Sequence, residues 1–267
     1  MAEAQREGIA VWTPVTIGQK ECAVWTFPTR RIFVERVDIE WHVLSQPSHI
    51  ASCPAIQAVI DRADKPHSSD WRHYLIRRPS ALHPVPVLPN RPLVVRPDRS
   101  LTILPGESAV FFLEIPVWFR LDAGEDGSMI FEEPLSILSN TWFGDPVNGE
   151  LCYTLDVRLH QSIDSVDPCA YLAICPLSLT NDSRQGLPFE KVCLHAENLS
   201  VFKGAKRLWT NGLSVLFRGQ DQGSQIQLDS EQPSFDDELV LASPAREPAA
   251  SWSIRKTFSL LKYFTEI

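Results

Sequence analysis

Glu150-Leu-Cys-Tyr-Thr-Leu-Asp-Val-Arg-Leu-His160 is the stretch that decides the fold class, because apolar and polar side chains alternate along it. In an extended backbone, successive side chains point to opposite faces, so a period of two indicates a half-buried β-strand. The pattern predicts that one face of this strand points into the core. That face carries Leu151, Tyr153, Leu155, Val157 and Leu159.

A second alternating stretch, Val37-Asp-Ile-Glu-Trp-His-Val43, predicts another half-buried strand by the same argument. Its polar residues would then face outward. The predicted inward set is Val37, Ile39, Trp41 and Val43, and the predicted outward set is Asp38, Glu40 and His42.

Two short turn sequences predict hairpins. Asn211-Gly212 separates the strand-like residues 207–210 and 213–217, and Asn-Gly accepts the positive φ values of a type I′ turn. Pro105-Gly106 separates residues 101–104 from 108–115, and Pro and Gly supply the dihedral angles of a tight reversal. Each pair of flanking segments is expected to form one antiparallel ladder.

These signals predict a mainly β protein with two packed antiparallel β-sandwich-like lobes, residues 1–133 and 134–267, and a short C-terminal helix. One large β-domain is the alternative. The helix is expected over residues 251–264, where Ile254, Phe258 and Leu261 recur at helical spacing. The proline-rich stretch 79–97 favours an extended, polyproline-like connection over a central strand.

The composition excludes several classes of protein. The chain has 267 residues, of which 44% are hydrophobic and 22% charged, as in an ordinary globular protein. The net charge of -8 argues against a surface built for nucleic acid or an anionic membrane. No apolar run approaches the roughly 20 residues of a membrane span, and the polar, acidic start lacks a secretory signal. A cytoplasmic location is therefore expected, with the six cysteines as reduced thiols.

Arginines concentrate between residues 71 and 99. Six of them stand against the single acid Asp98, a local excess of +5 in a chain of -8. Guanidinium groups bind phosphate and carboxylate in bidentate fashion, so the segment is a candidate anion site. The alternative is that these arginines pair with acids elsewhere in the fold. The arginines are Arg72, Arg77, Arg78, Arg91, Arg96 and Arg99, and the first three are the predicted ligand-binding residues.

The loop before the decisive strand combines an aromatic side chain with oxygen ligands. Trp142, Asp145, Asn148 and Glu150 could grip a small polar ligand, or the oxygens could hold Ca²⁺ although the spacing of a calcium loop is absent. The alternative is a long hairpin turn in which the same residues only set dihedral angles. These four residues complete the predicted ligand-binding set.

Cys193-Leu-His195 places a thiol and an imidazole on one strand face, and Cys152, Cys169 and Cys175 could approach them in a sheet. Zinc sites more often show paired C-x-x-C or H-x-x-x-H spacings, which the sequence lacks. Neither a metal nor a cofactor is therefore expected. The sequence also lacks a G-x-S-x-G elbow, a Walker loop and a Rossmann glycine pattern.

Four segments in the middle of the chain resemble a prokaryotic family, domain of unknown function 432. They are Leu104-Pro-Gly-Glu-Ser108, Glu114-Ile-Pro-Val117, Leu138-Ser-Asn-Thr-Trp-Phe-Gly-Asp145 and Asn148-Gly-Glu-Leu-Cys-Tyr153. The resemblance implies no activity. It singles out the loop 142–150.

Two function classes follow from these residues. The first is a non-catalytic ligand-binding or interaction module that takes a small anionic or polar ligand or a protein partner. The second is a hydrolase acting on a carbohydrate or phosphorylated substrate, with Asp145 and Glu150 as its carboxylates and arginines as anion clamps. Nucleic acid is disfavoured, because base-stacking aromatic residues are not interleaved with the arginines.

Overall fold

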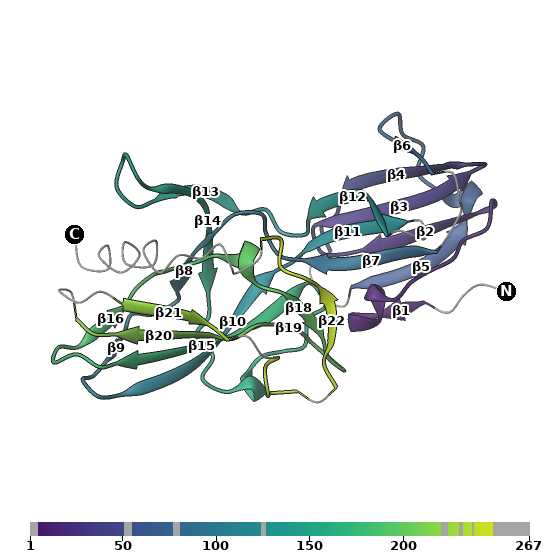
Figure 1. Cartoon of the computed structure of the whole chain (residues 1–267). Coiled ribbons are helices and arrows are strands. Elements are labelled where there is room, and N and C mark those ends of the chain that lie inside the picture. Colours follow the sequence, from purple (N-terminus) through teal and green to yellow (C-terminus); the bar gives the residue numbers. More distant parts are fainter. Residues whose placement is uncertain are drawn as a thin grey trace.

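Strands dominate the chain, which confirms the prediction of a mainly β protein (Figure 1). The computed structural model describes residues 5–50, 55–76, 81–123, 127–219, 224–229, 232–236 and 238–247. The predicted helix over residues 251–264 lies outside these ranges. Within them, no helix has the length and apolar character to cross a bilayer. The helices there are four short 3₁₀ segments: η1 (Gly8–Trp12), η2 (Arg62–Asp64), η3 (Ile163–Ser165) and η4 (Ala196–Asn198).

Two sheets form the strand group nearest the N-terminus (Figure 1). A six-stranded antiparallel sheet has the order β1 (Arg6–Glu7), β5 (Ile56–Asp61), β2 (Glu21–Thr26), β3 (Arg30–Val37), β4 (Glu40–Pro47) and β6 (Arg72–Leu75). A three-stranded sheet has the order β12 (Ser128–Pro134), β11 (Trp118–Ala123) and β7 (Leu82–Val87). Phe119 of β11 lies 5.4 Å from Trp25 of β2 between ring centroids, so the two sheets share one aromatic core.

The second strand group contains three further sheets. The largest has the order β21 (Ser224–Leu228), β20 (Leu213–Phe217), β15 (Leu172–Asn181), β19 (Leu208–Thr210), β18 (Val201–Lys203) and β22 (Val240–Ser243), with β10 (Ser108–Pro116) also paired to β15. A four-stranded sheet has the order β13 (Ser139–Phe143), β14 (Glu150–Val157), β8 (Leu93–Pro97) and β17 (Val192–Leu194). The smallest pairs β16 (Leu187–Phe189) with β9 (Leu101–Ile103).

Most strand pairs are antiparallel, as predicted, but three pairs are parallel. They are β14 with β8, β15 with β19 and β15 with β20. Strands β8, β9 and β10 come from residues 93–116, yet they pair with strands that follow residue 133. The arrangement as two sandwich-like lobes and the division at residue 133 stay predictions.

The proline-rich stretch 79–97 was expected to be a connection, and for its described part this is wrong. Residues 82–87 form β7 and residues 93–97 form β8. Pro84 and Pro86 are tolerated because β7 is an edge strand of its sheet. On the open side of an edge strand no neighbouring strand requires a backbone N–H, so proline costs no hydrogen bond there.

The predicted strand over residues 37–43 is wrong, because the chain reverses within it. Val37 pairs with Glu40 across a two-residue turn, and Asp38 adopts a φ of 53°. Ile39 is 55% exposed at this turn. Trp41 and Val43 are buried as predicted, and Glu40 and His42 share the opposite face of β4. Apolar and polar residues do alternate from 37 to 43, but the alternating stretch includes the turn of a hairpin and does not form one strand.

The predicted Asn211-Gly212 hairpin is also wrong. β19 and β20 both run parallel to β15, with Leu208 opposite Ala173 and Leu213 opposite Leu177, so they follow one another along the same strand edge. Asn211 lies between these two strands, where the ladder with β15 is interrupted. Its side chain accepts a hydrogen bond from the Ser200 N–H and donates one to the Asp229 carbonyl. Long-range contacts to these two residues replace the local turn.

The Pro105-Gly106 turn is present, but its flanking strands do not form the predicted ladder. The Glu107 N–H donates to the Leu104 carbonyl at 3.1 Å, and Gly106 has a φ of +78°. β9 then pairs with β16, and β10 pairs with β15. The turn therefore carries the chain from one sheet to another.

β14 confirms most of the decisive pattern. Leu155, Val157 and Leu159 are buried in the main core, and Tyr153 packs against it. Leu151 is 44% exposed, which contradicts its predicted place in the core, because it lies beyond the part of β14 that pairs with β8. On the opposite face, Cys152 is completely buried.

Candidate functional site

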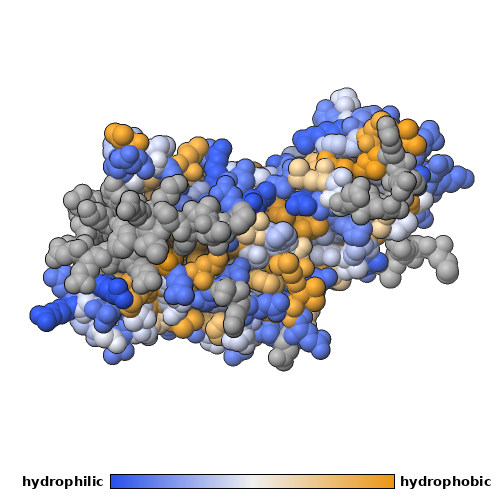
Figure 2. Space-filling view, in the orientation of Figure 1, coloured by the Kyte–Doolittle hydropathy of each residue, from blue (hydrophilic) through white to orange (hydrophobic). Residues whose placement is uncertain are grey.

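The predicted binding loop, residues 142–150, forms the tip of the β13–β14 hairpin. Residues 144–149 connect the two strands, with Phe143 opposite Glu150 at the base of the connection. The hairpin projects from the second strand group in Figure 1, and Figure 2 shows an apolar patch at its tip. Trp142 is 52% exposed and Val147 is 86% exposed. The sequence therefore presents apolar side chains to solvent on a projecting hairpin.

Asp145 organises this loop internally. Its Oδ1 atom accepts hydrogen bonds from the backbone N–H groups of Val147 and Asn148, both at 2.8 Å. The indole N–H of Trp142 donates to the Asp145 carbonyl at 3.0 Å. A Cβ added at Gly149 would clash with Trp142 Nε1 and with the Asp145 carbonyl oxygen, so only glycine fits at this position of the loop. These contacts favour the turn interpretation of Asp145 and Asn148, and their role in ligand binding stays a prediction.

Arg72, the one predicted ligand-binding arginine among the described residues, does not join this loop. Arg72 lies on β6, at the edge of the six-stranded sheet, with its guanidinium 5.5 Å from the centre of the Phe131 ring. Figure 1 places β6, which carries Arg72, and the β13–β14 hairpin in different strand groups. Arg77 and Arg78 lie outside the described residues.

One arginine of the same segment does lie near the hairpin. Arg91 lines a cleft of about 390 Å³ together with Trp118 of β11 and Asn140 and Tyr153 of the hairpin. Its guanidinium lies 5.4 Å from the centre of the Tyr153 ring and donates to Asn140 Oδ1 at 3.2 Å. Among the described residues, Arg91 forms no ion pair with a carboxylate. Its charge is therefore available to a ligand in this cleft.

The fourth predicted hairpin residue, Glu150, belongs to a different group of side chains. Cys152 of β14 and Cys193 of β17 lie on the face of their sheet that is opposite the main core, in a small cluster with Val94 and Phe143. Their Sγ atoms are 4.0 Å apart although β8 runs between their strands. Cys152 comes one residue before the part of β14 that pairs with β8, and Cys193 is opposite Val94, the second residue of β8.

Glu150 and His195 complete this group, which we call the thiol cluster: Glu150, Cys152, Cys193 and His195. Glu150 Oε1 lies 3.9 Å from Cys193 Sγ and 3.5 Å from His195 Nε2. One ligand atom from each of Glu150, Cys152 and Cys193 lies within 4.8 Å of the others. Glu150 and Cys152 are two residues apart on β14 and therefore share a face, whereas Cys193 lies on β17 and His195 directly follows the end of that strand.

Glu197 of η4 orients the imidazole of the thiol cluster. Its Oε1 atom lies 2.8 Å from His195 Nδ1, which directs Nε2 towards Glu150. Glu197 is only 8% exposed, and its Oε2 atom has no hydrogen bond partner among the described residues. A buried carboxylate on the far nitrogen of a histidine is the usual outer-shell partner of a metal-binding imidazole.

The environment of Cys193 is unfavourable for an isolated thiolate. The hydrogen bond with Cys152, burial, and the negative charges of Glu150 and Glu197 all raise the pKa of the Cys193 thiol. A bound cation inverts this situation, because a coordinating thiol loses its proton to the ion's charge. The thiol cluster therefore has the chemistry of a cation site.

The sequence predicts Glu150 as a ligand-binding residue but no metal site, because paired C-x-x-C and H-x-x-x-H spacings are absent from it. The pattern that indicates the site is instead a pair of possible metal ligands separated by one residue, the spacing that places two side chains on one face of a strand. It occurs twice, in Glu150-Leu-Cys152 and in Cys193-Leu-His195. Cys169 and Cys175, the other thiols expected to approach Cys193, are not in the group of donors that contains Glu150, Cys152 and Cys193. The role of Glu197 had no signal in the sequence.

Comparison with known proteins identifies a family. A family described as "Protein of unknown function (DUF432)" matches residues 11–262, which span both strand groups and the thiol cluster. This match confirms the resemblance seen in the four central segments, while the prokaryotic source stays a prediction. No curated protein and no solved structure matches the chain.

Proposed function

The chain belongs to this family of unknown function, and from that premise we propose that it is a non-catalytic binding module whose ligand is a thiophilic divalent metal ion such as Zn²⁺. Cys152, Cys193, His195 and Glu150 are the four ligands. Four protein ligands around zinc form a closed site, which suits a binding or structural role better than catalysis. A cytoplasmic location, where thiols stay reduced, is part of this proposal.

The separation of the two thiols carries the proposal. With Zn–S bonds of about 2.3 Å, two sulfurs of a tetrahedral site lie about 3.8 Å apart. The observed Sγ–Sγ distance is 4.0 Å, between residues on strands that another strand separates. This distance is close to the spacing that two sulfurs bound to one metal ion require.

The other donor separations agree with the same geometry. Zn–O and Zn–N bonds of about 2.0–2.1 Å give tetrahedral separations of about 3.5 Å for sulfur to oxygen and about 3.3 Å for nitrogen to oxygen. The corresponding distances are 3.9 Å from Cys193 to Glu150 and 3.5 Å from His195 to Glu150. Glu150, Cys152 and Cys193 already lie within 4.8 Å of one another, whereas His195 lies outside that group and would have to move towards the two thiols to become the fourth ligand.

Cobalt absorption tests this assignment. The reduced chain, stripped of metal with a chelator, is expected to bind one Co²⁺ and to show thiolate-to-cobalt charge transfer with the intense visible bands of a tetrahedral site. Zn²⁺ should displace the cobalt. Cys193→Ser should abolish most of the charge transfer, whereas Cys169→Ser, in the segment between η3 and β15, should retain it. A native chain that binds cobalt without charge transfer contradicts the proposal.

The Arg91 cleft supports a second binding role, for a small anionic ligand. Charge-assisted hydrogen bonds contribute about 1.5–3 kcal/mol, so Arg91→Gln is expected to weaken the binding of inorganic phosphate by about tenfold or more. Titration calorimetry measures this effect. Arg96→Gln, on β8 and not lining the cleft, serves as the matched control. Equal phosphate affinity in the native and Arg91→Gln chains would exclude this role.

A further inference from the structure

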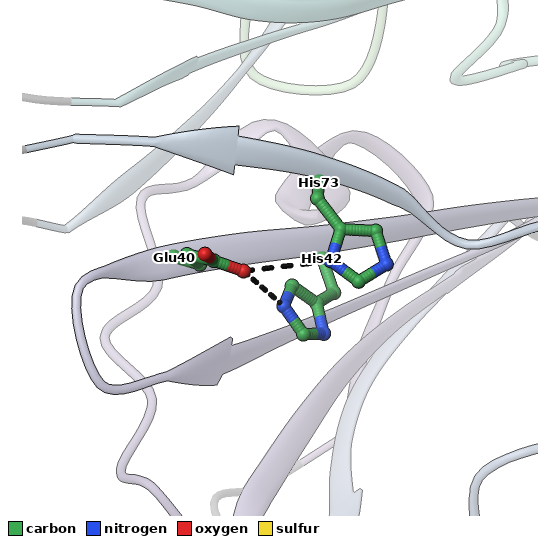
Figure 3. A group of neighbouring side chains, drawn as sticks. All are labelled: Glu40, His42 and His73. Carbon is green, nitrogen blue, oxygen red and sulfur yellow. Dashed lines mark hydrogen bonds and ion pairs between the residues drawn. The ribbon is translucent and has the colours of Figure 1, made fainter.

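A second group of donor side chains lies on the six-stranded sheet, in the other strand group from the thiol cluster (Figure 1). We call it the histidine cluster: Glu40, His42 and His73. His42 of β4 is directly opposite His73 of β6, and Glu40 shares the face of His42 because it lies two residues earlier. Figure 3 shows both imidazoles directed at the Glu40 carboxylate.

The distances within the histidine cluster match those of a metal site. Glu40 Oε2 lies 3.0 Å from His42 Nε2 and 3.4 Å from His73 Nδ1. With metal–ligand bonds of about 2.1 Å, two donors lie about 3.0 Å apart at an octahedral angle and about 3.4 Å apart at a tetrahedral one. Two histidines and one carboxylate on one face of an ion form a common transition-metal site.

His42 lies between two carboxylates, which a neutral imidazole cannot satisfy. Its Nδ1 atom is 3.3 Å from Glu35 Oε1, while its Nε2 atom faces Glu40. A neutral imidazole has one N–H, so one nitrogen would present a lone pair to a carboxylate oxygen. Either a proton or a metal ion between Nε2 and Glu40 removes this conflict.

The second histidine favours the metal ion. His73 Nδ1 faces the same Glu40 oxygen, and the two imidazole rings are 3.9 Å apart between centroids. A single divalent ion between the three donors would take a lone pair from each imidazole and from the carboxylate, so one ion accounts for the convergence of all three side chains.

Glu35 provides a rigid outer shell for His42. It is 1% exposed, and its carboxylate binds Lys65 Nζ at 2.5 Å and Arg62 Nε at 2.7 Å. Lys65 in turn lies 4.9 Å from the centre of the Trp71 ring. These contacts fix the oxygen that receives the His42 Nδ1–H, and such a hydrogen bond orients a metal-binding imidazole.

We propose that Glu40, His42 and His73 bind a late first-row divalent metal ion, such as Ni²⁺ or Zn²⁺, at a site independent of the thiol cluster. The side chains of Glu40 and His73 are 46% and 56% exposed, so coordination positions on the outer side face solvent. The ion is therefore exchangeable and can accept a further ligand from solution. Nitrogen and oxygen donors alone distinguish this site from the thiol cluster.

Nickel titration of the full Cys193→Ser chain, in which the thiol cluster is disabled, tests the proposal by calorimetry. We expect about one Ni²⁺ to bind per chain. Loss of an outer-shell partner alone costs about 10–100-fold in metal affinity, so removing a ligand by His73→Ala is expected to cost more than about tenfold. Glu40→Gln should weaken binding as well. His83→Ala, an exposed histidine of β7, should leave the affinity unchanged.

The proposal is overturned if the Cys193→Ser chain binds no nickel, or if its affinity is the same with His73→Ala. It is also overturned if His83→Ala weakens binding as much as His73→Ala does, because the nickel would then be held by dispersed surface histidines. None of these outcomes depends on whether the thiol cluster binds metal.

Discussion

Zinc is expected to stabilise the folded chain by about 4 kcal/mol when the free ion concentration is about 1,000 times the dissociation constant of the thiol cluster, because an ion that binds only the folded state stabilises it by RT ln(1 + [L]/Kd). For a chain of this length, each kcal/mol corresponds to roughly 2–4 °C, so the thermal midpoint should rise by about 8–16 °C. Circular dichroism melts in chelator and in zinc, both under reducing conditions, measure this shift.

Two substitutions assign the stabilisation to the thiol cluster. Cys193→Ser should remove most of the zinc-dependent shift, whereas Cys169→Ser should retain it. Glu197→Gln should lower the zinc affinity by about 10–100-fold, because Glu197 orients the His195 ring without binding the ion. Zinc that stabilises the Cys193→Ser chain as strongly as the native chain would show that the ion binds elsewhere.

The periodicity of the sequence predicted the class of fold but not the partners of its strands. Residues 155, 157 and 159 are buried as the alternation requires, because burial on one face leaves a direct trace in the sequence. The pairing of β19 and β20 with β15 leaves no such trace. There, contacts of Asn211 with Ser200 and Asp229 outweigh the local turn preference of Asn-Gly.

The two candidate metal sites could not be predicted from the sequence, because they too depend on which strands pair. In the sequence, Cys152 is 41 residues from Cys193, and their approach depends on the parallel pairing of β14 with β8 and the antiparallel pairing of β17 with β8. Glu40 and His42 lie on the face of β4 opposite Trp41 and Val43, as the alternation predicts, although the His42 side chain is only 13% exposed. Their meeting with His73 depends on the turn at Asp38 and on β6 joining the sheet edge. Two metal-binding residue types at positions i and i+2 of a strand therefore predict a metal site only weakly until the order of the strands is known.

Phe119→Ala is expected to lower the free energy of unfolding by about 3–5 kcal/mol, because a large aromatic side chain removed from a packed core leaves a cavity that neighbours fill only partly. Phe119 is completely buried on β11. Its ring lies within 6 Å of three others, 5.8 Å from Trp12, 5.4 Å from Trp25 and 5.9 Å from Phe27. Urea unfolding measures the loss. Phe235→Ala, whose side chain is 46% exposed, should cost about 1 kcal/mol.

The same variant tests whether the chain unfolds as one unit. Phe119 lies in the first strand group and the thiol cluster in the second, but β8, β9 and β10 connect the first half of the sequence to sheets of the second. We therefore expect one transition, which Phe119→Ala shifts to lower urea and zinc shifts to higher urea. Two transitions, with Phe119→Ala moving one and zinc moving only the other, would instead support two separately folding lobes. β8, from the first half of the sequence, lies between the strands that carry Cys152 and Cys193, which both come from the second half. A single transition would therefore agree with a thiol cluster whose ligands are held in place by strand pairing between the two halves of the sequence.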